Sequence, residues 1–211
     1  MHSKAMCWVA LDRLARLAEG GHVACPAAGF ARERDGIRAA IERQGVGAAG
    51  HYVSEFGGEA VDASLLLLSL LGYADPRSPR MRATVAAVRG RLGANGLLYR
   101  YRREDTADGL PGGEGAFGLC GFWAVGARVL EGDAAGARGD FEHLLTFAND
   151  IGLFAEQYDP ATGAALGNFP QAFTHVGVIN AAVALARAEG RAPEVRRVGA
   201  LPDAGDMRGH V

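Results

Sequence analysis

Seven segments of the chain repeat apolar residues with the period of an α-helix, and they follow one another along most of its length. In the first segment, Met6, Ala10 and Leu14 share one face, and Gly20 interrupts the pattern. The sequence therefore predicts helices over residues 6–17, 30–41, 60–72, 81–92, 117–130, 133–148 and 173–188. The third segment is apolar nearly all round, which predicts that this helix is buried.

The connections between these helices alternate in length. Pro76 and Pro79 lie in a short link between the third and fourth helices, and Gly132 lies in the link between the fifth and sixth. The links before Glu114 and after Asn149 are long. Alternating short and long links are typical of antiparallel helix pairs whose functional loops gather at one end. We therefore expect an all-α fold built from about seven helices in antiparallel pairs.

Two extended pieces and the C-terminal end depart from the helical pattern. Residues 51–56 and 97–103 alternate or carry β-forming side chains, and we interpret them as small β-hairpin insertions. Residues 191–211 contain Pro, Gly, Asp and Arg with little periodicity, which predicts a poorly ordered tail. Residues 1–190 are interpreted as a single domain.

Composition argues against several classes of function. The formal charge of −2 and a single lysine, Lys4, give no reason to expect nucleic acid or a membrane surface as a partner. The longest apolar run, residues 63–71, is shorter than the roughly 20 residues that a bilayer requires. The cysteines Cys7, Cys25 and Cys120 lack CxxC spacing, so neither a disulfide framework nor a zinc site is expected. With no signal peptide in view, we expect a cytoplasmic protein.

The connection before the last helix contains a carboxylate pair, Glu156 and Asp159, among aromatic residues. The aromatic residues are Phe154, Tyr158, Phe169 and Phe173. Flat apolar rings can pack against sugar rings, and carboxyl groups can bind hydroxyls and transfer protons. A second interpretation stays open, in which the aromatic residues only fix a long loop to the helices while the acids face water.

Six stretches of the sequence together resemble glycoside hydrolase family 15, in its glucoamylase-like and trehalase branch. They are residues 1–12 (MHSKAMCWVALD), 62–68 (DASLLLL), 98–102 (LYRYR), 109–117 (GLPGGEGAF), 153–160 (LFAEQYDP) and 167–180 (GNFPQAFTHVGVIN). The resemblance implies an (α/α)6 barrel, of which residues 1–190 form an incomplete copy. It also implies hydrolysis of α-glucosidic bonds with inversion, without a metal ion or an organic cofactor.

The same resemblance implies roles for individual residues. Glu156, the glutamate of the AEQYD motif, is implied to be the general base, and Gln157 and Tyr158 line or support its pocket. Arg100 resembles an arginine that holds glucose at the cleavage subsite, where its planar fork can donate paired hydrogen bonds to hydroxyls. Glu114 lies in a Gly-rich turn at a helix start, where backbone N–H groups favour its anion. We expect Glu114 to anchor sugar hydroxyls rather than to donate a proton.

The second catalytic carboxyl group is missing from this pattern. In the family, the general acid belongs to a Trp-Glu motif that falls before Met1, and the chain contains no Trp-Glu dipeptide. We therefore interpret the chain as the C-terminal part of an α-glucosidase barrel, inactive alone and able to associate through an exposed apolar face. A non-catalytic carbohydrate-binding remnant and a helical scaffold remain alternatives. The sequence does not separate trehalose from malto-oligosaccharides as the substrate.

Other polar and aromatic residues receive structural interpretations. Trp8 and Trp123 lie in apolar helical patterns, which predicts core packing rather than stacking on a sugar. Asp62 opens a buried helix and is interpreted as its cap or as a buried hydrogen-bond acceptor. His175, close to a helix start, is interpreted as a structural histidine.

Overall fold

The computed structural model describes residues 1–102 and 114–191, so the expected tail at 191–211 lies almost wholly outside the described residues. Within those two ranges the chain forms seven α-helices, one 3-10 helix and five strands of two residues each. The helices are α1 (His2–Glu19), α2 (Ala27–Gln44), η1 (Ala63–Leu66), α3 (Leu67–Leu70), α4 (Pro79–Leu92), α5 (Gly118–Glu131), α6 (Ala134–Leu145) and α7 (Ala172–Ala188). The expected all-α class with small strand insertions is confirmed.

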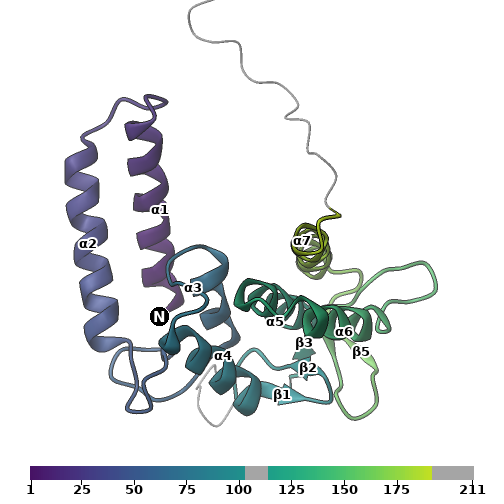
Figure 1. The fold of residues 1–211 in the computed structure, drawn as a ribbon. Coiled ribbons are helices and arrows are strands. Elements are labelled where there is room, and N and C mark those ends of the chain that lie inside the picture. Colours follow the sequence, from purple (N-terminus) through teal and green to yellow (C-terminus); the bar gives the residue numbers. More distant parts are fainter. Residues whose placement is uncertain (103–113, 192–211) are drawn as a thin grey trace, which may run out of the picture.

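The helices follow one another around an arc, as Figure 1 shows. The antiparallel pair α1 and α2 stands at one end of the arc, and α7 lies at the other end. Between them, α3 packs against α5, and α5 packs in turn against both α6 and α7. Each helix therefore buries its apolar face against neighbouring helices, and no β-sheet forms a layer of the core in the described residues.

Helix boundaries follow local chemistry that the sequence displays. The Ser78 side chain accepts a hydrogen bond from the backbone N–H of Met81, and Pro79 occupies the first turn of α4. Gly132 ends α5 with a φ of 98°, a left-handed conformation that glycine adopts without strain. Asp133 then caps α6 by accepting from Gly136 at 2.9 Å, as predicted.

The third predicted helix is shorter and less regular than residues 60–72. Asp62 has an extended backbone conformation, so the helical part begins at Ala63, first as η1 and then as the four-residue α3. Gly72, with a φ of 77°, ends the segment. Burial of this segment is confirmed, because Leu65, Leu66 and Leu68 are each at most 2% exposed.

The strands differ more from expectation. β1 (Gly93–Ala94) and β2 (Leu97–Leu98) form a hairpin around Asn95 and Gly96, which both have positive φ angles. Residues 51–56 contain no strand, and a single bridge joins Val46 to Tyr52 there. Of residues 97–103, only β2 is a strand in the described part of the chain.

A three-stranded antiparallel sheet joins two connections that the sequence treats as separate loops. β3 (Ala116–Phe117) pairs with β4 (Gln157–Tyr158), which pairs with β5 (Ala165–Leu166). Ala116 lies opposite Tyr158, and Gln157 lies opposite Leu166. The sheet therefore fastens the segment before α5 to the segment between α6 and α7.

Two clusters of buried side chains form the core. The first surrounds Trp8, Ile41, Leu66, Met81 and Leu92 and joins α1, α2, η1 and α4. The second joins the two small sheets to α5, α6 and α7 through Leu97, Phe122, Leu144, Phe154, Tyr158 and Leu185. None of the described helices is long and apolar enough to cross a membrane.

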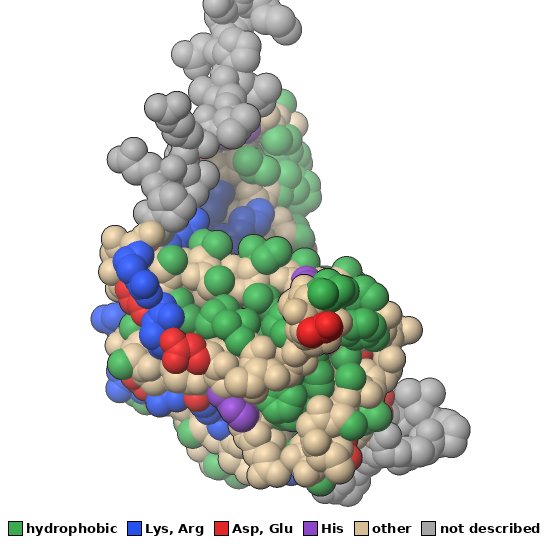
Figure 2. Space-filling model, turned by 90° about the vertical axis from the view of Figure 1, so that its right-hand side faces the viewer, with side chains coloured by type: hydrophobic (Ala, Val, Ile, Leu, Met, Phe, Trp, Pro, Cys, Tyr) green, Lys and Arg blue, Asp and Glu red, His purple; other side chains and the backbone are tan. Residues whose placement is uncertain are grey.

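One side of α7 is apolar and uncovered. Figure 2 shows hydrophobic side chains gathered over the face of the molecule that carries this helix. Phe173 is 70% exposed and Ile179 is 61% exposed, and Val176 and Val183 lie on the same helix and are also exposed. These positions recur at helical spacing, so they form a stripe along the helix.

Candidate active site

Glu156 lies immediately before β4, and its backbone is fixed on both sides. Its N–H donates to the carbonyl of Asn168 at 2.9 Å, and its carbonyl accepts from the N–H of Gly118 at 3.0 Å. Its carboxylate oxygen Oε2 accepts from the backbone N–H of Asn168 at 3.0 Å and from Asn168 Nδ2 at 2.8 Å. The carboxylate is partly exposed and its orientation is held by one neighbouring residue.

A glycine permits this close approach. Gly167 has a φ of 71°, and a Cβ atom at this position would lie 2.8 Å from Glu156 Oε2. Another residue here would combine backbone strain with a clash against the carboxylate. The turn is therefore shaped around the Glu156 side chain.

Gln157 fastens β4 to the segment that carries the predicted substrate-binding residue Glu114. The Oε1 atom of Gln157 accepts from the backbone N–H of Gly115 at 2.8 Å. Glu114, half-buried, directly precedes Gly115, and the β3–β4 pairing starts at Ala116. The antiparallel register places Glu156 opposite Gly118 and puts Glu114 beyond Tyr158, so the two carboxylates flank opposite ends of the β3–β4 pair.

Tyr158 supports this end of the sheet from inside the core. Its side chain is 2% exposed, and its hydroxyl accepts from the N–H of Ala155 at 2.8 Å. Burial raises the pKa of this hydroxyl. Its ring packs against Phe147 at a centroid distance of 5.1 Å. Tyr158 is therefore buried beneath the loop, and its expected function at the site stays a prediction.

The other residues of the predicted aromatic loop divide into two groups. Phe154 is buried against Phe122, so it fixes the loop to the helices, as the second interpretation holds. Phe169 and Phe173 are instead exposed. Asp159 turns away from Glu156, because hydrogen bonds from the Ala161 N–H and the Thr162 hydroxyl hold its carboxylate and lower its pKa.

His175 has a structural position. Its Nδ1 lies 2.8 Å from the carbonyl of Gln171, and its Nε2 accepts from the backbone N–H of Phe154 at 3.4 Å. The ring therefore joins the start of α7 to the loop that precedes Glu156, which agrees with the structural interpretation. Among the described residues, no three His, Cys, Asp or Glu side chains gather in a way that could hold a metal ion.

Arg100 follows β2 and pairs with Asp62. Arg100 Nε lies 2.9 Å from Asp62 Oδ1 and 3.2 Å from Oδ2. The guanidinium carbon lies 5.9 Å from the centre of the Trp123 ring. Burial and the positive charge of Arg100 both lower the pKa of nearby His2. β2 contacts β3, so the backbone that precedes Arg100 lies beside the strand that follows Glu114.

Trp123 lines a hollow of about 220 Å³ between α3, α5 and α7. The lining is mainly apolar and includes Leu67, Leu70, Phe122, Gly177 and Ala181. Both tryptophans pack in the first core cluster, as predicted: Trp8 is 5% exposed, and Trp123 packs against the cluster while one part of it is exposed beside this hollow.

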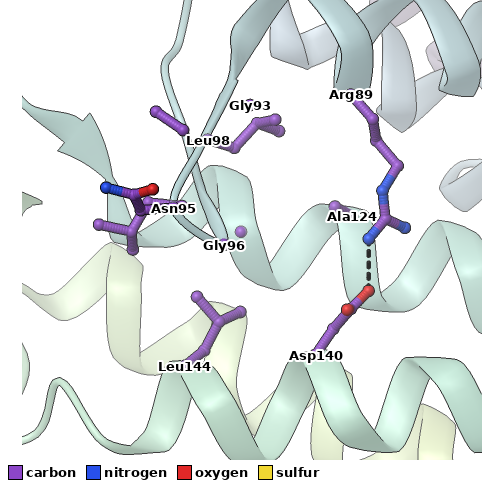
Figure 3. Close-up of a pocket in the computed structure, with 11 residues that line it drawn as sticks. Arg89, Gly93, Asn95, Gly96, Leu98, Ala124, Asp140 and Leu144 are labelled. Atoms are coloured by element: carbon purple, nitrogen blue, oxygen red, sulfur yellow. Dashed lines mark hydrogen bonds and ion pairs between the residues drawn. The ribbon is translucent and has the colours of Figure 1, made fainter. Parts of the chain in front are cut away.

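A second hollow, of about 210 Å³, lies between the β1–β2 hairpin and helices α4, α5 and α6 (Figure 3). Arg89 and Asp140 form an ion pair at one edge of it, at 2.5 Å. Asn95 donates its side-chain N–H to the carbonyl of Pro160. None of the five predicted site residues lines this hollow, and these polar groups are already paired, so it is not the site that the sequence predicts.

The motifs and the arrangement of helices agree with a comparison against known families. The family model of glycosyl hydrolases family 15 matches residues 1–140 and 134–183. The chain belongs to this family. Its predicted resemblance to the glucoamylase-like and trehalase branch is thereby confirmed at the level of the family.

A trehalase is similar to this chain in sequence. The trehalase of Mycobacterium tuberculosis (strain ATCC 25618 / H37Rv) is 47% identical over 187 residues. The match covers 89% of this chain and 28% of the trehalase. The chain therefore spans less than a third of the length of this relative.

Solved glycosidases share the fold. A bacterial glucoamylase complexed with acarbose aligns with a TM-score of 0.73 at 19% identity, covering 89% of this chain and 33% of that chain. A glycosidase in complex with glucose gives the same TM-score of 0.73 at 24% identity, covering 91% and 52%. The predicted incomplete (α/α)6 barrel is confirmed by these likenesses.

The sequence analysis did not connect Asn168, Asp62 or Trp123 with the candidate site. Asn168 and Asp62 lie in two of the stretches that resemble the family, but nothing in their spacing shows which side chain each one contacts. Trp123 was assigned to the core because its neighbours are apolar. For these glycosidase-family residues, three-dimensional contacts supplied information that residue type and periodicity do not carry.

Proposed function

We propose that this chain is the base-bearing part of an inverting α-glucosidase, with Glu156 as the general base. The observation that carries the proposal is the arrangement of the Glu156 carboxylate. Both N–H groups of Asn168 bind Oε2, and no hydrogen bond from another described residue reaches Oε1. One oxygen is thus used for orientation while the other can accept a proton from water.

The chemistry follows from that geometry. Glu156 removes a proton from a water molecule, and the oxygen of that water forms a bond to the anomeric carbon as the glycosidic bond breaks. The leaving oxygen takes a proton from a second carboxyl group on the opposite side of the sugar. A separation of about 6.5–9.5 Å between the two carboxyl groups leaves room for the water and inverts the configuration.

The remaining site residues bind or support. Arg100 donates to hydroxyls of the glucosyl unit at the cleavage point, and half-buried Glu114 accepts from sugar hydroxyls. Gln157 holds the Glu114 segment against β4 through its bond to Gly115. Tyr158 holds the loop from below, where its hydroxyl binds the backbone of Ala155. The reaction requires no metal ion and no organic cofactor.

The substrate class is an α-glucoside, either trehalose or a malto-oligosaccharide. Support comes from relatives and neighbours, which are named trehalase and glucoamylase. The resemblance to the family assigns the general acid to a Trp-Glu motif, and this chain holds no Trp-Glu dipeptide. We expect the isolated chain to bind sugar and to have negligible turnover.

We propose that the isolated chain forms a dimer in which the apolar stripe on α7 is buried against a second copy of the chain. Exposed apolar area of this kind favours association because burial removes it from water. Phe173, Val176, Ile179 and Val183 supply that area.

The decisive experiment uses two preparations, the chain itself and the chain extended upstream to include the Trp-Glu motif. Calorimetry should show trehalose or maltose binding to the chain alone. From trehalose, the extended protein should release one β-glucose from the attacked unit for each α-glucose that leaves, as followed by NMR. In the extended protein, Glu156→Gln should lower kcat by at least about 100-fold. Asp159→Asn, a carboxylate lost from the same loop, should retain activity.

Each other outcome has a defined meaning. Absence of sugar binding by both preparations would support a helical scaffold. Binding without turnover in the extended protein would support a non-catalytic carbohydrate-binding remnant. Release of α-glucose alone from trehalose would exclude inversion.

A further inference from the structure

Asp62 makes two kinds of contact at once. Its Oδ1 accepts from the backbone N–H of Ser64 at 2.6 Å, which caps the start of η1. The same carboxylate binds Arg100 Nε through both oxygens, at 2.9 and 3.2 Å. The backbone N–H of Ala63 also donates to the carbonyl of Arg100 at 2.8 Å. The start of η1 and Arg100 therefore form one connected unit.

The choice of nitrogen matters for what Arg100 can do. A guanidinium group has five N–H donors in a rigid plane, and Nε carries one of them. A contact through Nε fixes the direction of the plane, while the four donors on the two terminal nitrogens take no part in that contact. Trp123 lies near the guanidinium, at 5.9 Å from its carbon, and it also lines the hollow between α3, α5 and α7.

We infer that Asp62 is a positioning residue, which orients Arg100 so that its terminal N–H groups meet the hydroxyls of a glucosyl unit beside Trp123. This inference rests on the proposed sugar-binding function of Arg100. Asp62 itself does not touch the sugar. Without its partner, the arginine side chain would sample many rotamers, and the entropy of ordering it would weaken sugar binding.

Asp62 could instead serve only as a helix cap, and chemistry separates the two functions. Asn caps helices about as well as Asp, so Asp62→Asn keeps an acceptor for the Ser64 N–H. The amide loses the negative charge that holds Arg100. A cap function alone would leave sugar binding unchanged.

The chain offers a matched control at the junction of α5 and α6. Asp133 caps α6 by accepting from Gly136, and it also binds an arginine through Nε, that of Arg128 at 2.7 Å. Asp133→Asn therefore removes the same chemical pair from another helix start. None of the predicted site residues contacts it.

The test compares four forms of the chain: wild type, Asp62→Asn, Asp133→Asn and Arg100→Lys. Trehalose and glucose titrations by calorimetry give the affinities, at a temperature well below each Tm. Asp62→Asn should weaken binding by about tenfold, and Asp133→Asn should leave it unchanged. NMR should show a slowly exchanging Arg100 Nε–H in wild type that is lost in Asp62→Asn.

The double variant Asp62→Asn with Arg100→Lys should bind no more weakly than Arg100→Lys alone, because the two residues act as one unit. Wild-type affinity in Asp62→Asn would overturn the inference and leave the proposed function intact. An equal loss of affinity in Asp133→Asn would also overturn it, as a general effect of stability. No sugar binding by wild type would remove the proposed function and the inference together.

Discussion

Asn168 donates its backbone and its side-chain N–H groups to the same oxygen of Glu156, at 3.0 and 2.8 Å. In return, the N–H of Glu156 donates to the carbonyl of Asn168. Three hydrogen bonds between two residues close the ends of a turn of a dozen residues. The orientation of the carboxylate therefore depends on the conformation of that turn.

Gly167→Ala should displace this turn. The new Cβ would meet Glu156 Oε2 at 2.8 Å and would force a φ of 71° on alanine. The cost should be at least about 1 kcal/mol of unfolding free energy, measured by urea denaturation. The control is Gly163→Ala, which has a similar φ of 74° and only a contact at 3.8 Å. Equal effects of the two variants on stability and on sugar binding would show that the Glu156 contact is unimportant.

Glu42 should stabilise the first core cluster through two tyrosines. Its Oε1 accepts from the hydroxyls of Tyr52 at 2.8 Å and Tyr73 at 2.7 Å, and its Oε2 binds Arg80. Burial, together with Glu42, raises the pKa of Tyr52 to about 12, so this hydroxyl stays protonated as a donor. Glu42→Ala should cost about 2–3 kcal/mol because it leaves both buried hydroxyls without this acceptor.

The comparison for that prediction is Tyr52→Phe, which removes one hydroxyl and leaves Glu42 with its other partners. We expect a loss of about 1 kcal/mol in urea denaturation. If Glu42→Ala cost no more than Tyr52→Phe, the network would contribute little to stability.

Stability at acidic pH should depend on Glu189 at the end of α7. Arg138 on α6, and then Arg191, lower the pKa of Glu189 from 4.5 to about 2. Because the folded pKa lies below the unfolded value, this pair stabilises fully above pH 4.5 and less as the pH falls toward 2. The Tm difference between wild type and Arg138→Gln should therefore shrink as pH falls through this window.

Arg32→Gln provides the control for the pH experiment. Arg32 is exposed on α2 and forms no ion pair with the described part of the chain. The Tm of Arg32→Gln should equal that of wild type at every pH. A Tm difference for Arg138→Gln that stays constant from pH 7 to pH 2 would contradict the assigned pair.

The stripe on α7 should control self-association. Replacing Phe173 and Ile179 together by Ser removes two large exposed apolar side chains, so the dissociation constant of a dimer should rise at least about tenfold. Sedimentation equilibrium at several concentrations gives the measurement. Leu17→Ser, at an exposed apolar position on α1, is the control. A monomeric wild-type chain at all concentrations would contradict the prediction.

The helices were predictable because their signals are local. A period of 3.6 residues, a left-handed glycine at Gly132 and a capping aspartate at Asp133 act within a few positions, and the structure has each of them. The third segment was predicted less well. Its N-terminal boundary depends on Asp62, whose extended conformation accompanies its contact with Arg100, 38 residues away.

The small sheet and the surroundings of Glu156 could not be predicted from the sequence because they also depend on contacts between residues far apart in the chain. Gly115 and Gln157 are 42 positions apart, and two-residue strands show no alternation that could identify them. Glu156 itself was recognisable from its motif. The partner that orients it, Asn168, is one polar residue among several in the same loop, and only the folded turn shows which one binds.

The pairing of β3 with β4 also limits how this scaffold can be re-engineered. Ala116 opposite Tyr158 and Gly115 bonded to Gln157 mean that the two loops share a register. In a chimera that takes only one loop from a relative, the strand of that loop would not match the register of its partner strand. Residues 114–117 and 156–168 should be exchanged as a single cassette, since selection on either loop acts on both.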